Sequence, residues 1–332
     1  MTGVITNDLF LQRMTELKDL IKAEAEKLGF CLCGFTTADP SEDYARYTRW
    51  LAEESLGTMS YLKREDTLAK RADPHLLLQD AESICVLAVP MGLFPQEPAF
   101  SVASYAHYVD YHDAIHSMAE ELIRSVRLRT EEEFSCRICV DSAPILERSL
   151  AVRAGLGWIG KSSMLVNERW GSAIFLCEIL LSLSLEPDAP FVHDRCGNCE
   201  RCVKACPNGC IDPVSRTIQA DRCAAYLTIE HKGEFDHEQS GLVGEKLFGC
   251  DECLRACPWN RNNTGTSPIP LCDMIPDEND ELLTESEFKA KFQNSPVLRT
   301  KAKGLKRNIE AVRRNMNQQG NDSPPHQRKI EC

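Results

Sequence analysis

The sequence predicts a protein of about two domains in which helices and strands are mixed. Its 332 residues exceed the usual size of one domain, and 43% of them are hydrophobic, which is enough for sizeable cores. The chain also holds 17 cysteines, and seven of them fall in two short runs, within 196–206 and 250–257. These observations predict a folded first domain, a second domain organised around bound metal, and a short C-terminal part.

The first cysteine run has a spacing typical of iron–sulfur proteins. It reads Cys196-x2-Cys199-x2-Cys202-x3-Cys206 and is followed by Pro207. In this pattern three thiolates wrap one [4Fe–4S] cluster, and the cysteine before the proline ligates a neighbouring cluster. The sequence therefore predicts two clusters that exchange a ligand between the two runs.

The second run completes both ligand sets only if a more distant cysteine joins it. It has two close cysteines and a Cys257-Pro258 step, one cysteine fewer than the first run, and Cys223 lies between the runs. With the cysteines before the two prolines exchanged, eight thiolates serve two clusters. Cluster one is predicted to have the ligands Cys196, Cys199, Cys202 and Cys257, and cluster two Cys206, Cys223, Cys250 and Cys253.

Zinc sites and disulfides explain this pattern less well. Zinc also binds C-x2-C pairs, but as four ligands in one closed tetrahedron, which pairs flanked by Cys-Pro turns do not suit. Disulfides need an oxidising compartment, and nothing in the sequence indicates secretion. Three further cysteines, Cys210, Cys272 and Cys332, are predicted to be dispensable for cluster content.

Charge and hydropathy predict a cytoplasmic protein without a membrane segment. The N-terminus has no apolar signal core and no twin arginine, and no apolar run is long enough to span a bilayer. The formal net charge of −12 argues against binding of nucleic acid over the whole surface. The segment 299–314 is locally basic, with seven cations against Glu310. Such a stripe is compatible with a phosphate-backbone contact, although a solvated helix face is the simpler explanation.

Hydrophobic periodicity predicts where the elements lie along the chain. An amphipathic helix is expected at 7–29, ending at Gly29, and a short strand at 30–35. Further strands are expected at 83–90, 137–140 and 172–183. Further helices are expected from Pro40 to Trp50, from the end of the segment 104–112 to Leu128, from Pro144 to Arg153 and within 284–316. Residues 262–280 are predicted to be a linker, and the tail around Pro324 and Pro325 to be disordered.

Several motifs resemble the epoxyqueuosine reductase family. They are DSAPILERSLAVRAGLGWIGK at 141–161, YLTIEHKG at 226–233, FGCDECLRACPWN at 248–260 and DYH at 110–112, together with the cysteine runs. The resemblance spans most of 50–310. It implies an α+β fold with a nitroreductase-related cobalamin-binding catalytic domain at 1–190, a ferredoxin-like domain with two [4Fe–4S] clusters at 191–265, and a linker, basic helical segment and tail at 266–332.

The resemblance also implies an activity and its partners. Members of this family reduce the epoxide of epoxyqueuosine, at the wobble position of tRNA, to queuosine, with cobalamin that receives electrons through the clusters. The implied partners are a tRNA carrying epoxyqueuosine and an unidentified low-potential electron donor, and the chain is expected to be a monomer.

Asp141 matches the proton donor of this family. Opening of an epoxide needs an acid at the departing oxygen. Burial against the corrin is therefore expected to raise the pKa of Asp141, against the effect of a helix that starts nearby. Taken without the resemblance, Asp141 is equally well explained as a helix N-cap. The resemblance places cobalamin contacts at Arg64, Ser104, Asp141, Ser162, Leu165, Leu176, Ala225 and Asp251, and a tRNA contact at Lys232.

The chain departs from the family pattern at several points. Ser104 stands where members commonly have arginine, Ser162 stands where asparagine is frequent, and the chain ends too soon for a full C-terminal helical-repeat domain. The basic stripe is expected to replace part of that domain. Asp110-x-His112 is followed by Ile115 where a cobalamin-ligating D-x-H-x-x-G motif has glycine, so His112 is expected to be structural.

Two other functions are compatible with parts of the sequence. A dehalogenase-like enzyme would use cobalamin and clusters on a small organic substrate, but such enzymes usually carry an export signal and do not need YLTIEHKG. A simple electron carrier would leave about 190 residues before the clusters unexplained.

Overall fold

The computed structural model describes residues 7–53, 55–97, 99–263 and 266–322. Its centre is an antiparallel sheet with the strand order β1-β2-β7-β4. The strands are β1 (Leu32–Thr37), β2 (Ser83–Pro90), β7 (Ile174–Leu181) and β4 (Cys136–Cys139). Phe35, Cys85 and Ile179 lie opposite one another across β1, β2 and β7, and all three are buried. The sheet therefore has a continuous apolar row on this face, as the predicted strands require.

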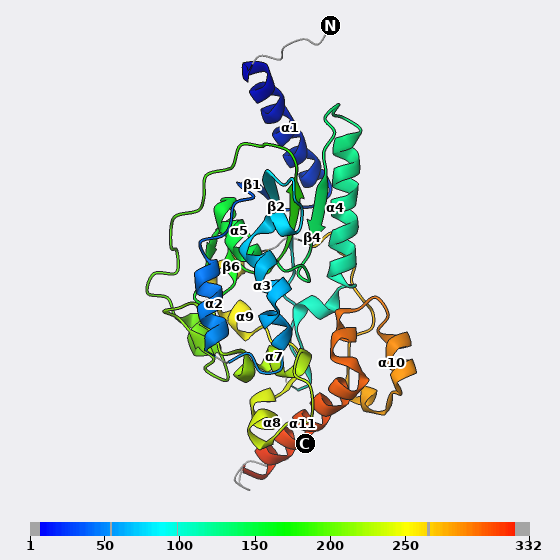
Figure 1. The fold of residues 1–332 in the computed structure, drawn as a ribbon. Coiled ribbons are helices and arrows are strands. Elements are labelled where there is room, and N and C mark those ends of the chain that lie inside the picture. Colours follow the sequence, from blue (N-terminus) through cyan, green and yellow to red (C-terminus); the bar gives the residue numbers. More distant parts are fainter. Residues whose placement is uncertain (1–6, 54, 98, 264–265, 323–332) are drawn as a thin grey trace.

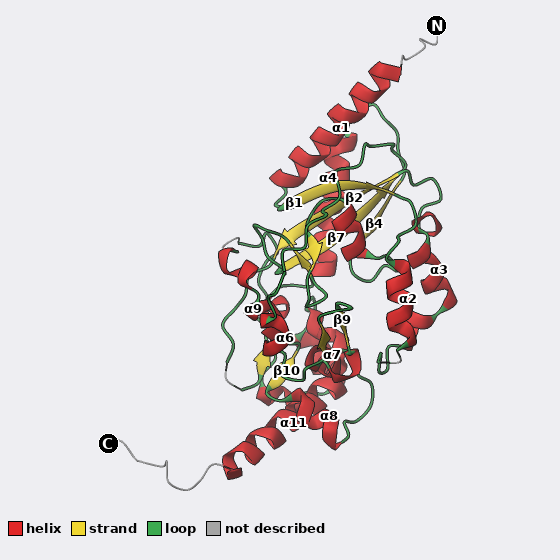
Figure 2. Ribbon diagram, turned by 90° about the vertical axis from the view of Figure 1, so that its left-hand side faces the viewer, coloured by secondary structure: helices red, strands yellow, loops and turns green. Residues whose placement is uncertain are grey.

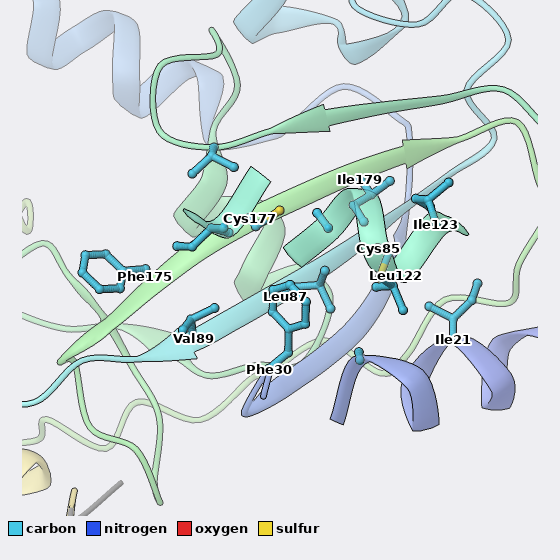
Figure 3. Packing of buried hydrophobic residues seen from close by; sticks show 14 of the residues in the cluster. Ile21, Phe30, Cys85, Leu87, Val89, Leu122, Ile123, Phe175, Cys177 and Ile179 are labelled. Carbon is cyan, nitrogen blue, oxygen red and sulfur yellow. The ribbon is translucent and has the colours of Figure 1, made fainter. Parts of the chain in front are cut away.

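Two long helices, α1 (Asn7–Lys27) and α4 (Tyr111–Arg127), cover that face of the sheet (Figure 1). Met14, Leu17 and Ile21 recur at helical spacing on α1 and are buried. Figure 3 shows Ile21 and Leu122 packed beside the side chains of the central strands. This core confirms the amphipathic helix predicted near the N-terminus, and it holds the first residues of α4 against the sheet.

The other face of the sheet is covered by α5 (Glu147–Arg153), through the buried side chains Leu150 and Ala151. This helix begins three residues later than Pro144 predicts, because residues before Glu147 form a turn that includes a positive φ at Asp141. The hairpin β5 (Trp158–Ile159) and β6 (Leu165–Val166) follows it. Helices α2 (Tyr44–Ala52) and α3 (Glu65–Ala72) lie beside each other at the side of the molecule (Figure 2).

The cysteine-rich part contains short elements, which lie below the sheet in Figure 2. They are α6 (Arg201–Ala205), β8 (Ile211–Asp212), β9 (Thr217–Ile218), α7 (Ala224–Ile229), α8 (His237–Val243), β10 (Lys246–Phe248) and α9 (Glu252–Ala256). Strand β10 pairs in parallel with β3 (Ser101–Val102) from the first predicted domain. Chain segments far apart in sequence therefore meet in one small sheet next to Cys250.

The C-terminal helices α10 (Glu285–Lys291) and α11 (Lys301–Asp322) lie at the end of the molecule opposite α1 (Figure 1). Leu305 and Ile309 of α11 are buried in one cluster with Phe248 of β10, Phe288 of α10 and Phe292, which follows α10. The segment predicted as a linker is packed rather than free, since Ile269 is buried in the main core and the Cys272 N–H donates to the His107 carbonyl at 2.8 Å. Pro324, Pro325 and Cys332 lie outside the described residues.

Across the described ranges, none of the helices combines the length and the apolar character that crossing a membrane requires.

Candidate functional site

Asp141 lies just after β4, on the turn that leads into α5. Its φ of 50° is sparsely populated for residues other than glycine, although aspartate tolerates it better than most. The Asp141 N–H donates to Oε1 of Glu147, the first residue of α5, at 2.7 Å. Its side chain is 57% exposed. The carboxylate is therefore accessible from outside although the backbone that carries it is held in place.

Two neighbouring residues of α4 bind the Asp141 carboxylate. The Tyr111 hydroxyl donates to Oδ2 at 2.8 Å, and His112 Nε2 lies 3.0 Å from the same oxygen. His112 Nδ1 lies 2.7 Å from Oδ1 of Asp110. An imidazolium donates from both ring nitrogens, so protonated His112 satisfies both carboxylates at once. The Tyr111 ring stacks on Phe175 with 4.6 Å between centroids, which fixes the direction of its hydroxyl.

These contacts favour a proton on His112 rather than on Asp141. Burial lowers the pKa of His112, but hydrogen bonds and charges from Asp110 and Asp141 raise it overall to about 9. Partial loss of water around the carboxylate raises the pKa of Asp141, but hydrogen bonds from His112 and Tyr111 outweigh it, and the pKa lies below its usual value. At neutral pH the pair is an imidazolium beside a carboxylate.

This geometry bears on three expectations from the sequence. In the protein alone, hydrogen bonds from two donors lower the pKa of Asp141, whereas the predicted rise depends on burial against the corrin. Asp141 is not the N-cap of α5, since Leu146 occupies that position. His112, expected to be structural, contacts Asp141 across 29 positions of sequence. The D-x-H spacing drew attention to His112, but nothing local in the sequence indicates its partner.

Two further carboxyl groups near Asp141 were missed by the sequence analysis. Burial and the charge of Asp141 raise the pKa of Glu147 to about 7. Glu178 of β7 is fully buried, and neither of its carboxyl oxygens has a hydrogen-bond partner in the structure. Burial, followed by the charges of Glu147 and Asp141, raises the pKa of Glu178 well above its usual value. Only the run of apolar residues around Glu178 could have indicated its burial.

The four cysteines predicted for cluster one line a single cavity. Cys196, Cys199, Cys202 and Cys257 surround it, together with Gly160, Ser162, Trp259 and neighbouring residues. Trp158 Nε1 donates to Cys196 Sγ at 3.4 Å. A side chain at position 160 would lie 3.6 Å from the same sulfur and 2.8 Å from Val166, so glycine keeps this wall of the cavity open.

The cysteines predicted for cluster two also lie near one another. The Cys253 thiol is within electrostatic range of Cys250, Cys223 and Cys206. Within the described ranges, no three His, Cys, Asp or Glu side chains converge closely enough to hold a single metal ion. A cubane spaces its thiolates more widely than a single ion does, so this finding does not conflict with the predicted clusters. Cys210 also lies here, with its Sγ 3.3 Å from Cys206 Sγ.

The residues predicted to contact cobalamin occupy different environments. The Ser104 N–H donates to Oδ2 of buried Asp251 at 2.7 Å. Tyr105 is half-buried, and its ring lies 6.0 Å from the ring of Tyr111, which donates to Asp141. It follows Ser104 in the chain, so the side chains that hold Asp141 and Asp251 are close together here. Arg64 is exposed and pairs with Asp66 at 3.2 Å. The remaining predicted contacts are Ser162, which lines the cluster-one cavity, Leu165, which is buried in the core under α5, and the half-buried Leu176 and Ala225.

Lys232 is exposed on the loop after α7, and its N–H donates to Thr58 Oγ1 at 3.2 Å. The loop is also held by Arg307, whose guanidinium stacks 4.0 Å from the Phe235 ring centroid and donates to the carbonyls of His231 and Gly233. Arg307 is buried, so this member of the basic stripe is structural and does not face solvent.

Three more cations of the stripe are paired with carboxylates. Arg299 donates to Glu230 at 2.8 Å, Lys303 lies 3.0 Å from Glu234, and Arg313 pairs with Glu281. The stripe is therefore less basic than its sequence suggests. Its other members, Lys301, Lys306 and Arg314, are exposed.

Comparison with known proteins agrees with this arrangement. Residues 195–260 match the family model of the 4Fe-4S double cluster binding domain, and residues 71–142 match the model described as epoxyqueuosine reductase QueG. An epoxyqueuosine reductase of Cellulophaga algicola is 39% identical over 309 residues, which are 89% of this chain and 97% of the relative. The epoxyqueuosine reductase of Escherichia coli K12 is 35% identical over 302 residues, 86% of this chain and 78% of the relative.

Solved structures show the same relationship. An epoxyqueuosine reductase bound to an epoxyqueuosine-modified tRNA-Tyr stem loop has a TM-score of 0.77 and 28% identity, covering 91% of this chain and 82% of that one. A Bacillus subtilis epoxyqueuosine reductase, solved with its catalytic aspartate loop swung out of the active site, has a TM-score of 0.78 at 28% identity and the same coverage. These relationships favour the reductase over the dehalogenase-like and electron-carrier alternatives. Because identity is well above 30% over nearly all of the chain, this protein belongs to the epoxyqueuosine reductase family of oxidoreductases.

Proposed function

We propose that this protein reduces epoxyqueuosine to queuosine at the wobble position of tRNA. The reaction removes the epoxide oxygen as water and consumes two electrons and two protons. The observation that carries the proposal is the accessible Asp141 carboxylate, bound by His112 and Tyr111. Its test is anaerobic turnover of epoxyqueuosine-containing tRNA with cobalamin and a strong reductant, followed by nucleoside mass spectrometry. Queuosine should form, and its absence with cofactor-loaded protein would contradict the proposal.

The residues around Tyr105 fit a bound cobalamin. Asp141 is held by Tyr111, whose ring lies 6.0 Å from that of half-buried Tyr105. Asp251 accepts from the Ser104 N–H and is adjacent to Cys250 of the second cysteine group. Arg255 donates to Ser104 Oγ at 3.3 Å, so a guanidinium lies beside the position where the family commonly has arginine. Ser104, Asp251, Ala225 and Leu176 are the residues proposed to hold the cofactor, with Arg64, Ser162 and Leu165 retained from the family pattern. Bound cobalamin supplies strongly reduced cobalt that passes electrons to the substrate.

Asp141 is proposed to deliver a proton to the departing epoxide oxygen. The proton is stored on His112, whose pKa of about 9 keeps it protonated at neutral pH, and it passes through the shared hydrogen bond to the Asp141 carboxylate. Tyr111 holds the same carboxylate oxygen and orients it. A catalytic aspartate loop that swings out of the active site is described for the Bacillus subtilis relative. The 141–146 turn is its proposed counterpart in this chain.

The two cysteine groups are proposed to bind two [4Fe–4S] clusters with the exchanged ligand sets. Cys250 of cluster two is adjacent to Asp251 in sequence, so this cluster would lie near a cofactor held by Asp251. Iron and acid-labile sulfide, measured after anaerobic reconstitution, are expected at about eight of each per chain, since each cubane contributes four. A value near four in fully reconstituted protein would contradict the two-cluster assignment. Absorbance and EPR spectra of the same sample separate cubanes from adventitious iron.

The tRNA is proposed to contact Lys232 and the exposed cations of α11. Lys232 lies on a loop anchored both to Thr58 and to Arg307 of α11, so the loop and the helix present one connected surface. Cations on such a surface neutralise phosphates and release counterions. Since the substrate is tRNA, the protein is proposed to act in the cytoplasm, as a monomer that receives electrons from a separate low-potential donor.

Replacement of Lys306 and Arg314 by glutamine is expected to weaken tRNA binding and to flatten its salt dependence. Loss of two phosphate contacts reduces the slope of log K against log salt by about 1.4 for single-stranded RNA. The matched control replaces Arg13 and Arg124, which lie on α1 and α4 away from α11, and removes the same charge. Filter binding across a salt series measures both variants. If the two variants bind alike, these cations belong to a solvated helix face.

A further inference from the structure

Cys210 is a buried thiol in contact with two of the proposed ligands of cluster two. It is 3% exposed, and its Sγ lies 3.3 Å from Cys206 Sγ. It also lies close enough to Cys223 for the two thiols to shift each other's pKa. Cys210 is therefore a fifth thiol beside the four proposed ligands of cluster two, and it lies next to Cys206.

The loop that joins Cys206 to Cys210 explains this proximity. The Gly209 N–H donates to the Cys206 carbonyl at 3.2 Å, and Gly209 has a φ of 58°, so the chain reverses between the two cysteines. Asn208 Nδ2 donates to the Arg222 carbonyl at 2.7 Å, which ties the loop beside Cys223. A Cβ added at Gly209 would meet nothing within 4 Å, so the outer side of the loop has room for a shift.

We propose that Cys210 is a reserve ligand of cluster two, which binds the iron otherwise held by Cys206 when Cys206 is absent or blocked. The inference rests on the proposed ligand set of that cluster. In this exchange, Cys210 Sγ forms one Fe–S bond to the iron that has lost, or never formed, its bond to Cys206. The Cys210 thiol releases its proton to solvent. No electron is transferred. The short distance between the two sulfurs means that a local movement of the 207–209 loop is sufficient.

Iron and sulfide content after anaerobic reconstitution tests this proposal, together with low-temperature EPR of the reduced and oxidised protein. Four variants are compared with the unmodified chain: Cys206→Ala, Cys210→Ala, the double variant, and Cys253→Ala as a matched removal of another cluster-two ligand. Cys206→Ala and Cys210→Ala should each keep about eight iron, whereas the double variant and Cys253→Ala should lose roughly half, because only cluster one remains. The retained cluster one and circular dichroism show that each variant is folded.

Loss of a cluster in Cys206→Ala alone, equal to the loss in Cys253→Ala, would overturn the proposal. A three-iron signal in Cys206→Ala would overturn it as well, because the fourth iron would then have found no thiolate. Loss of iron in Cys210→Ala would show instead that Cys210 is an ordinary ligand. If the unmodified chain itself binds only about four iron, the two-cluster assignment fails rather than the role of Cys210.

Discussion

Replacement of Asp141 by asparagine is expected to reduce turnover by about a hundredfold to ten-thousandfold, the range of general acid catalysis. Asparagine keeps the size of the side chain and can still accept from Tyr111 and His112, but it cannot pass a proton to the substrate. Single-turnover formation of queuosine under anaerobic conditions measures the change. Cobalamin content, iron content and tRNA affinity should stay at the values of the unmodified protein, since none of them needs the acid.

Asp19→Asn is the matched control for this variant, because Asp19 is exposed on α1. It should leave turnover unchanged. Activity of Asp141→Asn within about threefold of the unmodified protein would refute the acid role, because general acids contribute far more than that. Loss of cobalamin from Asp141→Asn would show that Asp141 is an anchor for the cofactor, and the proton would then have to come from water.

Replacement of His112 by asparagine is expected to reduce turnover at neutral pH by about a hundredfold, the lower end of the general-acid range. The variant removes the group that stores the proton and leaves Asp141 in place. His116→Asn, one turn further along α4 on an exposed position, is the matched control and should be neutral. The comparison therefore separates loss of the imidazole at Asp141 from a general effect on the helix.

The pH dependence distinguishes this role of His112 from a merely structural one. In the unmodified protein His112 keeps its proton until the pH rises through about 9, so turnover should fall as the pH passes through that value. In His112→Asn, Asp141 loses the hydrogen bond from His112, which lowers the pKa of Asp141 in the unmodified protein. The pKa of Asp141 should therefore rise in the variant, but a carboxyl group still ionises well below pH 9. Its activity should therefore already decline with rising pH in the acidic range. A decline near pH 9 in both proteins would show that another group donates the proton.

The basic stripe shows why a charge pattern in the sequence overstates the number of cations that a folded surface offers to a ligand. Seven cations lie close together in 299–314, and the sequence does not reveal which carboxylates face them. In the folded chain, Glu230 and Glu234 come from the loop after α7 to pair with Arg299 and Lys303, and Arg307 is buried beneath that loop. A helix exposes a cation only where no other segment covers it, and such coverage depends on packing between distant residues.

The sequence by itself determined the family, the positions of the main strands and helices, and the two cysteine groups. These features depend on short-range patterns: alternation along a strand, spacing along a helix, and the distances at which neighbouring cysteines can wrap a cluster. The tertiary structure alone decided the chemistry around Asp141. His112 reaches it from α4, Glu147 from α5, and buried Glu178 lies in β7 with its carboxyl group unpaired. The pKa of each group depends on which charges and donors packing brings within a few ångströms, and residues 29 positions apart carry no local signal of that contact.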